Sequence, residues 1–355
     1  MKTSFVCFMA FGLSLVLQAP QDTKSAKPQA SAPSQPPGTI QLGEIDFFGY
    51  GDLDPLKLRE ALPIHQGERY SPAEWGQLRP KIKEEITKLT GHAPTDLARV
   101  CCDSRGAAML YIGIALSIKP VVPLPVPHGD ARLPAQALKL ENDHEEASSK
   151  AVHAGNNGED DSKGYALSTD PATRAFELEI RKFTLGHSEL VRRVLRTSGD
   201  VEHRRVAAEF LGYDRASATQ VTALVEAARD PDSVVRNNAV RALGVLAEAG
   251  DKIAVKIPAS PFIDLLNSGQ WTDRNKGGFV LDSLTKSRDP EVLVELHQKS
   301  MPALIEMARW QFNGHAVGYR RLLGRIAGIE EAKLNKMIGD PGQIEAIVKA
   351  AEVTR

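Results

Sequence analysis

The sequence predicts a mostly α-helical protein, in which a C-terminal α-solenoid of helix pairs follows a small domain of order β-α-α-β-β (α+β). Three observations lead to this fold class. Ala, Leu, Val and Arg dominate the second half of the 355-residue chain, and aromatic residues make up only 6% of the whole, which favours packed helices. A helical pattern in the second half recurs at a regular spacing. Before it, two helix patterns lie between one strand-like run and a hairpin of two strands.

Residues 1–19 have the pattern of a secretory signal peptide. Lys2 precedes an apolar run, Phe5–Leu17, which ends at Leu17-Gln18-Ala19 and is short for a membrane span. An uncleaved N-terminal anchor is the alternative. Residues 20–38, rich in Pro, Ser and Ala, predict a disordered linker. No later segment reaches the ~18 continuous apolar residues that a spanning helix needs. We therefore expect a periplasmic or secreted protein that is not transmembrane after signal removal.

Residues 39–118 carry the pattern of the small α+β domain. A strand-like run begins at Ile40, and Asp54-Pro55 then predicts a helix with a capping aspartate and proline at its first position. Ser71 and Glu74 have the spacing of a capping box and predict the start of a longer helix. This helix carries apolar residues at three- and four-residue steps, namely Trp75, Leu78, Ile82, Ile86 and Leu89.

Two strands are predicted to close the domain. They cover Leu97–Cys102 and Ala107–Ile114, and the turn between them contains Gly106, which suits a positive φ. Neighbouring side chains of a strand point to opposite faces. Cys101 and Cys102 are therefore predicted to be thiols, one packed inward and one facing outward, with a strained vicinal disulfide as the alternative.

The order of these elements resembles the polypeptide-transport-associated (POTRA) domain. The matching residues are Phe48-Gly49 at the end of the first strand, the helix from Pro55, and the run Gly67-Glu68-Arg69-Tyr70-Ser71 before the longer helix. The resemblance implies that an extended polypeptide or a neighbouring domain docks by strand addition at a sheet edge. A generic small α+β sandwich without such a role is the alternative.

Residues 119–186 predict a connecting region. Alternating prolines between Lys119 and Pro127 cannot donate the hydrogen bonds of a central strand, so we expect an extended connector. Pro134–Val152 has a modest helical pattern. The loop Ala154–Gly164 contains Glu159-Asp160-Asp161, which lacks the spacing of a calcium loop and predicts a solvated acidic linker.

The pattern Asp200–Gly212 recurs as Asp232–Gly244, an offset of 232 − 200 = 32 residues. Each unit reads as helix, short turn with aspartate, helix and glycine. A third copy, from Phe262 to Leu284, is weaker, and a fourth, ending at Leu322-Leu323-Gly324, is degenerate and contains an insertion. Glu330–Thr354 predicts a polar C-terminal cap, so residues 187–355 form the repeat domain. Asp232 is placed to cap the second helix of its unit.

This pattern resembles HEAT repeats of the short variety also seen in phycobilisome-lyase-like proteins. The resemblance implies a structural ladder, in which the aspartates Asp200 and Asp232 pair with the arginines Arg204 and Arg236 of adjacent repeats. Asn237 and Asn238 lie on an otherwise apolar-patterned helix and need partners wherever they are buried. They either bridge the turns between repeats or bind an extended peptide of a partner.

The sequence contains no convincing catalytic, cofactor-binding or metal-binding set. The 44 basic and 45 acidic residues argue against a nucleic-acid partner. The repeat-domain histidines lack metal-ligand spacing, and we expect them on solvated helix faces: His187, His203, His297 and His315. Gly277-Gly278 lies within a helical pattern and predicts close packing rather than a phosphate site. No phosphate-binding loop, nucleophile elbow or dinucleotide motif is present.

These features favour an exported, non-enzymatic scaffold that binds an unidentified protein partner and needs no cofactor. The small domain would act through its sheet edge and the solenoid through its inner groove. One alternative is a lyase-like repeat enzyme or accessory that handles a tetrapyrrole cofactor. Another, implied only by the POTRA resemblance, is an accessory of envelope protein assembly or translocation.

Overall fold

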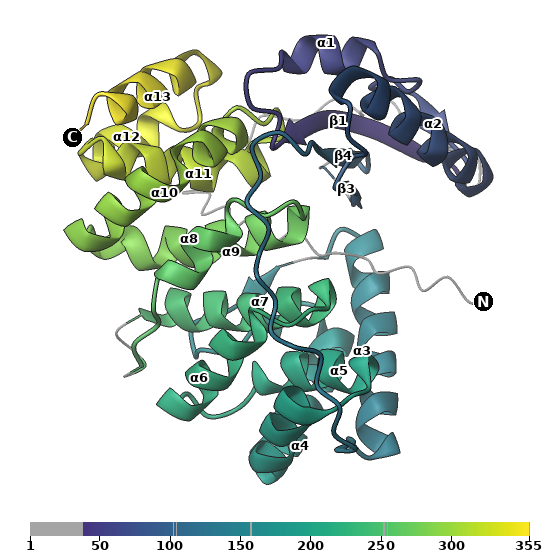
Figure 1. Cartoon of the computed structure of the whole chain (residues 1–355). Coiled ribbons are helices and arrows are strands. Elements are labelled where there is room, and N and C mark those ends of the chain that lie inside the picture. Colours follow the sequence, from purple (N-terminus) through teal and green to yellow (C-terminus); the bar gives the residue numbers. More distant parts are fainter. Residues whose placement is uncertain are drawn as a thin grey trace, which may run out of the picture.

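The computed structural model describes residues 38–101, 103, 105–156, 158–250, 253 and 255–354. The predicted signal peptide and all of the predicted linker except Gly38 lie outside these residues. The predicted fold class is confirmed, because a small sheet domain precedes a long series of paired helices (Figure 1).

The N-terminal sheet module, residues 39–118, has four strands in the order β2-β1-β4-β3. β1 runs parallel to β4, and the outer pairs are antiparallel. The elements follow the predicted order with one addition, the two-residue strand β2 between the helices. Their bounds are β1 Ile40–Phe48, α1 Pro55–Glu60, β2 Arg69–Tyr70, α2 Pro72–Thr90, β3 Asp96–Val100 and β4 Ala108–Gly113.

The local signals in the module act as predicted. Asp54 accepts a hydrogen bond from the backbone N–H of Leu56, and Pro55 occupies the first turn of α1. Ser71 and Glu74 form a reciprocal capping box at the start of α2, which satisfies backbone donors that the helix itself leaves unpaired. Gly91 ends α2 in the left-handed conformation. These contacts are local, so the sequence alone is enough to specify them.

The sheet is buried on both faces. Leu110 and Ile112 pack with α1 and α2 in one apolar cluster. Phe48, Met109 and Tyr111 belong instead to the core of the helical repeats. Every residue of β4 is buried as a result. The module is therefore not an independently packed domain, because one face of its sheet is part of the core of the repeat domain.

Four helix pairs form the repeats, and α3 and a short hairpin precede them. The bounds before the first pair are α3 Ala135–His153, β5 Glu159–Asp160 and β6 Leu167–Ser168. The pairs are α4 Pro171–Thr197 with α5 Val201–Leu211, α6 Ala218–Ala227 with α7 Ser233–Ala249, α8 Ser260–Leu265 with α9 Trp271–Leu284, and α10 Pro290–Ala308 with α11 Asn313–Ile326. The domain start expected at residue 187 falls inside α4, where His187 has non-helical backbone angles.

The second helices α5, α7, α9 and α11 pack on one another in chain order. Gly278 of α9 permits this packing, because a Cβ there would lie 2.5 Å from the ring of Tyr319 in α11. The C-terminal residues form the cap expected there, α12 Glu331–Met337 and α13 Ile344–Glu352. The cap also contributes apolar side chains to the core, including Leu334 and Ile347.

Candidate interaction surface on the second helices

One arginine in each of the first three units joins its own turn to the next unit. Arg204 donates to both carboxylate oxygens of Asp230, at 2.8 and 3.1 Å, and to the carbonyl of Ser198. Arg236 makes the same kind of fork to Asp273, with both distances 2.9 Å. Planar guanidinium groups suit such two-point binding of carboxylates.

The third member of this series is Arg274, which the sequence comparison missed. It donates to the carbonyl of Ser268 at 2.7 Å and to Glu306 at 3.3 Å. Gln270 is the residue before the second helix of the third unit, so the spacing from Asp232 is 270 − 232 = 38 residues rather than 32. A fixed 32-residue repeat therefore could not locate it.

The aspartates of the predicted ladder lie at the helix starts. Asp200 caps α5 by accepting from the N–H of Glu202, and Asp232 caps α7 by accepting from Val234 and Val235. Asp232 also forms an ion pair with Arg205 at 2.7 Å, whereas Arg204 forms its ion pair with Asp230. Asp200 lies 3.8 Å from Arg132 of the connector. The pairs thus differ by one or two positions from those that the resemblance implied.

Asn237 and Asn238 are half-buried on α7. The side-chain amide of Asn237 donates to Asn238, which in turn donates to the backbone carbonyl of Arg205 at 3.3 Å. Asn238 thereby connects two neighbouring second helices rather than two turns. The side-chain oxygen of Asn237 is buried without a hydrogen-bond partner.

The sheet module covers the N-terminal ends of α9 and α11 with aromatic side chains. Tyr111 stacks on Trp271 with ring centroids 5.2 Å apart and lies 4.7 Å from Trp310. The indole N–H of Trp310 donates to the carbonyl of Phe47 at 2.9 Å. Buried aromatic pairs of this kind contribute beyond the area that they bury.

His315 lies inside this aromatic cluster, so the expected solvated helix face is wrong for this residue. Its Nδ1 is 2.5 Å from the hydroxyl of Tyr111. Burial and the nearby charge of Lys276 lower the pKa of His315 to about 3, so the ring is neutral at physiological pH. A neutral Nδ1 accepts the hydroxyl proton of Tyr111, which makes His315 a structural partner of the sheet.

Glu306 of α10 forms the polar centre of the same contact. Its carboxylate accepts from the backbone N–H groups of Gly49 and Gly51, at 2.6 and 3.2 Å, and from the hydroxyl of Ser117. It also pairs with Arg274, whose guanidinium stands 4.9 Å from the ring centroid of Phe48. This single carboxylate therefore links the end of β1 to two helical units.

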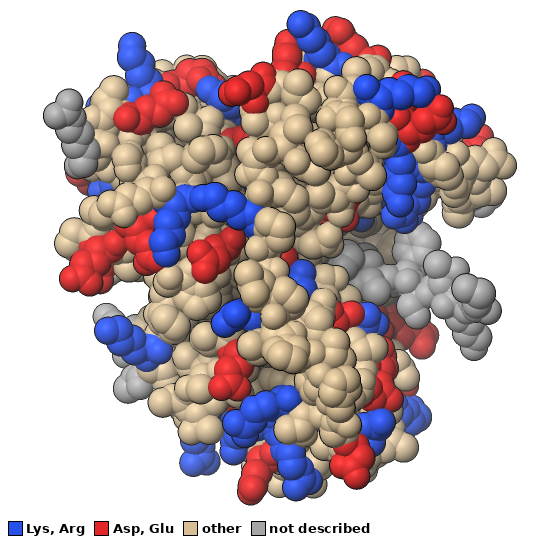
Figure 2. All heavy atoms as spheres, viewed as in Figure 1, with Lys and Arg blue, Asp and Glu red and all other residues tan. Residues whose placement is uncertain are grey.

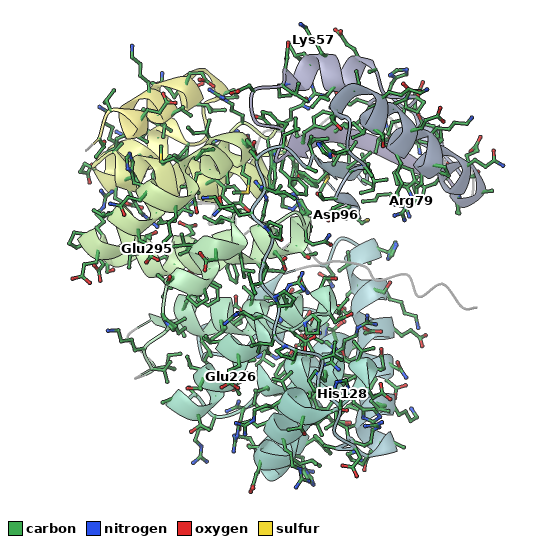
Figure 3. The ribbon with its side chains drawn as sticks, viewed as in Figure 1. Lys57, Arg79, Asp96, His128, Glu226 and Glu295 are labelled. Carbon is green, nitrogen blue, oxygen red and sulfur yellow. The ribbon has the colours of Figure 1, made fainter. Side chains whose placement is uncertain are left out.

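The outer edge of β1 is covered by α1 and by the repeats. The carbonyl of Ile45 accepts from Arg59 and from the side-chain amide of Gln311, and Trp310 takes the carbonyl of Phe47. Strand addition needs free backbone groups at an edge. The expected docking at a sheet edge is therefore blocked along this part of β1. At the opposite edge, Asp96, which is labelled in Figure 3, accepts from the N–H of Trp271, and the carbonyl of Thr95 accepts from Gln270.

The proline-rich connector follows the turns of the repeats. The N–H of Lys119 donates to Asn267, that of Leu124 to Arg229, and that of Gly129 to Thr197, at 2.8 Å in each case. Figure 1 shows this segment crossing α9 and α7 toward the first unit. The connector is extended as predicted, but it is held against the solenoid rather than being free.

Two carboxylates of the acidic loop, those of Glu159 and Asp161, are buried, so the predicted solvated linker is wrong for these two residues. The carboxylate of Glu159 forms an ion pair with Arg241 of α7, and the side chain is only 9% exposed. Asp161 is buried too. The β5–β6 hairpin is held by the N–H of Ser168, which donates to Glu177 at 2.6 Å, and by Arg181, which stacks on Tyr165. The hairpin thus lies on α4, α5 and α7.

We call the surface under the hairpin the inner face, defined by Glu209, Asn238, Arg241 and Lys276. Arg241 lies 3.9 Å from Glu209 on its other side. Burial, the largest cause, raises the pKa of Glu159 to about 7 even though Arg241 opposes it. Burial also lowers the pKa of Lys276 to about 8. The charges of this face are therefore brought together at an energetic cost.

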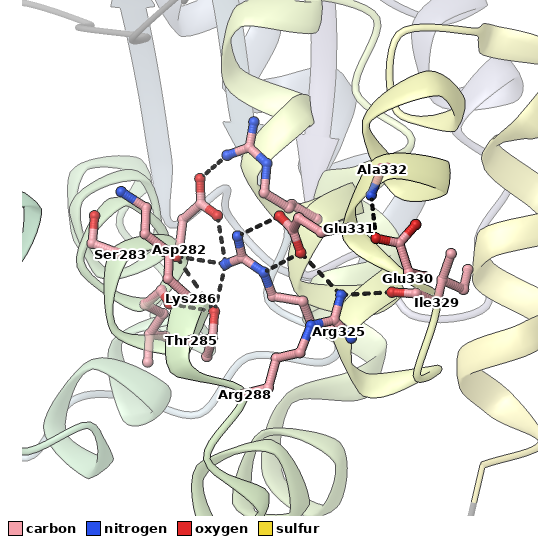
Figure 4. Close-up of polar contacts among 12 residues, drawn as sticks. Asp282, Ser283, Thr285, Lys286, Arg288, Arg325, Ile329, Glu330, Glu331 and Ala332 are labelled. Atoms are coloured by element: carbon pink, nitrogen blue, oxygen red, sulfur yellow. Dashed lines mark hydrogen bonds and ion pairs between the residues drawn. The ribbon is translucent and has the colours of Figure 1, made fainter.

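A further charged network joins the third and fourth units to the C-terminal cap (Figure 4). Asp282 pairs with Arg321 and Arg325, and Glu331 pairs with Arg325 and Arg288. The guanidinium of Arg325 is buried, and it also donates to the carbonyl of Asp282 at 2.6 Å. Each charge has an opposite partner within the network, so its role is structural.

Cys101 is disulfide-bonded, so the predicted thiol is wrong at this position. The other two cysteines lie outside the described residues. Within the described part of the chain, no group of His, Cys, Asp and Glu side chains is arranged to hold a metal ion. No helix among those residues is both long and apolar enough to cross a bilayer.

On the face of the molecule drawn in Figure 2, basic and acidic side chains are interspersed, and neither kind forms one large patch. The fold defines the class of the protein, an α-solenoid whose second helices are covered by earlier segments of the same chain. Residues 188–274 match the family model of HEAT repeats. This match supports a HEAT-repeat protein, and it runs from within α4 of the first unit to the start of α9 in the third.

No curated protein matches the sequence. Among solved structures, the crystal structure of an engineered protein is similar, with 16% identity and a TM-score of 0.34, over 52% of this chain and 91% of that chain. A TM-score this low supports no argument about fold or function.

Two contacts of the sheet module were missed from the sequence although signals existed. The run Ala107–Ile114 is apolar at nearly every position, which is typical of a strand buried on both faces. Trp271 and Trp310 stand beside turns where a solvated residue is expected, and this placement indicates a covering partner. Glu306 gave no signal, because its backbone partners Gly49 and Gly51 lie more than 250 residues away.

Proposed function

We propose that this protein is an exported, non-enzymatic scaffold that binds a protein partner on the second helices of its repeats. One observation carries the proposal. Arg241 of the inner face lies within the segment that matches HEAT repeats, and it already binds a segment from elsewhere in the chain, the β5–β6 hairpin, through Glu159, 82 residues before it. HEAT repeats form extended surfaces that commonly bind proteins.

The rigid frame of the molecule supports the same proposal. The sheet module, the connector and the repeats share one apolar core and a series of hydrogen bonds across the turns. Such a frame presents side chains in fixed positions, which lowers the entropic cost of binding. Export is supported by the basic and apolar N-terminal pattern of Lys2 and Phe5–Leu17 and by the disulfide at Cys101, since disulfides persist in oxidising compartments.

A photo-crosslinking experiment tests the proposal in the full chain. A photoreactive amino acid replaces Lys163, an exposed residue of the hairpin, and the protein is irradiated in the cells that produce it. We expect one specific protein adduct. The matched control is Glu226, which is exposed on the first helix α6 (Figure 3) and should give no such adduct.

The N-terminal residue of the same purified protein tests whether the predicted signal peptide is removed. Mass spectrometry should find a chain that starts near Pro20. Equal adducts at Lys163 and Glu226, or no adduct at either, would contradict binding at the second helices. An intact Met1 in the mature protein would contradict cleavage at the predicted signal.

A further inference from the structure

Two cations of the inner face come from neighbouring second helices. Arg241 belongs to α7 and Lys276 to α9, and these helices pack directly on one another. Both side chains are largely buried, with Arg241 17% exposed. The carboxylate of Glu209 from α5 approaches Arg241 at 3.9 Å. The inner face therefore brings two cations and one carboxylate of the second helices together.

The hairpin adds negative charge beside these cations. Glu159 forms its ion pair with Arg241 and interacts electrostatically with Lys276. Asp161 adds a second carboxylate that interacts with Arg241. Because the pKa of Lys276 is lowered only to about 8, this amine carries its proton in most molecules at neutral pH. The inner face thus binds an acidic segment of this chain, the first strand and the turn of the hairpin.

The fit of the hairpin leaves buried polar atoms unsatisfied. The hydroxyl of Tyr213 has no hydrogen-bond partner, although the side chain is only 2% exposed. Tyr213 lines a cavity of about 10 Å³ together with Asn238 and Arg241. One carboxylate oxygen of Asp161 is also buried without a partner. Unpaired buried groups cost free energy, so the hairpin is an imperfect occupant of this face.

The hairpin is also short. Each strand has two residues, and the strands share only the pairs Glu159↔Ser168 and Asp160↔Leu167. An isolated two-stranded hairpin is at best marginally stable in water. Its position therefore depends on the contacts that it makes with the helices, which include the burial of Leu167, the ion pair to Arg241 and the hydrogen bond from Ser168 to Glu177.

We propose that Arg241 and Lys276 form a carboxylate-binding site for an extended acidic segment of the protein partner, and that residues 158–168 occupy this site as an internal competitor. The inference rests on the proposed function. The partner segment replaces Glu159 with its own carboxylate and supplies an acceptor for the hydroxyl of Tyr213. Release of the hairpin is then the step that couples partner binding to a change in this chain.

A peptide-binding experiment on the full chain tests the site. The probe is a fluorescein-labelled synthetic copy of the hairpin, GEDDSKGYALS, and the control peptide carries glutamine at the position of Glu159. Binding is measured by fluorescence anisotropy to the wild type, to Glu159→Gln and to the double variant Glu159→Gln/Arg241→Gln. The single variant removes the competing charge but keeps the shape of the side chain.

We expect the probe to bind Glu159→Gln on the order of tenfold more tightly than it binds the wild type, because a charge-assisted contact of the competitor is lost. The double variant and the control peptide should both lose this gain. Equal binding of the probe to all three chains, or no binding to any, overturns the proposal.

A measurement on the wild type keeps the proposal testable if a variant does not fold. Saturating probe should increase amide hydrogen exchange at Ser168 and Thr169, whose N–H groups are bonded in the docked hairpin. Unchanged protection at saturation overturns the competitor role. If the photoreactive residue at position 163 captures a protein partner while the acidic probe does not bind, the proposed scaffold function is supported and the proposed carboxylate-binding site is wrong. If both fail, the proposed function itself is wrong.

Discussion

The sheet module and the β5–β6 hairpin cover adjoining parts of the same layer of second helices. On α9 and α11 the covering groups are aromatic, with Tyr111 stacked on Trp271. On α5 and α7 the covering group is a carboxylate, Glu159, paired with Arg241. Burial of apolar surface stabilises a fold directly. In a buried ion pair, the cost of removing both charges from water offsets much of their mutual attraction.

This difference separates a permanent cover from a replaceable one. The module buries a full sheet face and shares the main core. The hairpin buries only Ala166 and Leu167 among its apolar side chains, together with charged and polar groups of which some stay unpaired. Perturbing the module should therefore unfold the whole protein, while perturbing the hairpin should open one local segment. Three experiments test this contrast.

The largest effect is expected for Glu306→Gln. The change leaves the guanidinium of Arg274, which is 0% exposed, without its charged partner, and an amide cannot accept every hydrogen bond that Glu306 accepts. We expect the free energy of unfolding to fall by about 3–5 kcal/mol, measured by urea denaturation. The matched control on the same helix is Glu295→Gln, a surface ion pair with Lys299, which should cost less than about 1 kcal/mol. Equal losses would contradict the module as part of the core.

A smaller effect is expected from pH at the module contact. Burial raises the pKa of Asp46 from 3.8 to about 6, although hydrogen bonds from Gln311 oppose it. The folded state therefore holds this proton more tightly than the unfolded state does. The stability that the proton provides is complete below about pH 4 and is lost as the pH rises through 6.

Relative to Asp46→Asn, the wild type should lose on the order of 3 kcal/mol between pH 4 and pH 7. Urea denaturation of both proteins across this range measures the difference. The remaining titrating groups are common to both and cancel in the comparison. A difference that stays constant with pH would show that Asp46 titrates alike in the folded and unfolded states.

The smallest global effect is expected for Gly164→Ala at the hairpin. Gly164 has a φ of +77°, a conformation that costs an L-residue roughly 1–2 kcal/mol. Hydrogen exchange at Gly164 and its neighbours should quicken on the order of tenfold, while the urea midpoint changes little. Gly76→Ala in α2, where an added Cβ meets nothing within 4 Å, should leave the hairpin amides unchanged. A global loss as large as that of Glu306→Gln would make the hairpin part of the core.

The parts of the fold predicted from the sequence are those specified by near neighbours in the chain. Ser71 and Glu74 are three residues apart, and Asp232 caps the helix that it begins. The repeat of Asp200–Gly212 was visible because two units share their turn length. The third unit has a longer spacing between its second helix and that of the second unit. The repeat pattern therefore does not reveal Arg274, although this residue makes contacts of the same kind.

The candidate site could not be predicted in the same way. Glu159 sits in a polar loop with glycines on either side, and sequence rules assign such a loop to solvent. Its burial depends on Arg241, which lies on another element. His315 was misplaced for the same reason, because Tyr111 and Trp271 come from distant parts of the chain.

The sequence by itself determined the helix pairs, their caps, the order of the sheet module and the extended connector, because hydrophobic period, capping residues and proline act over a few residues. Only the tertiary structure decided which surfaces remain open. Packing the sheet on α9 and α11, and Glu159 on Arg241, brings together groups separated by 82 residues or more. Those pairings depend on the summed burial and charge of both partners, which no local pattern contains.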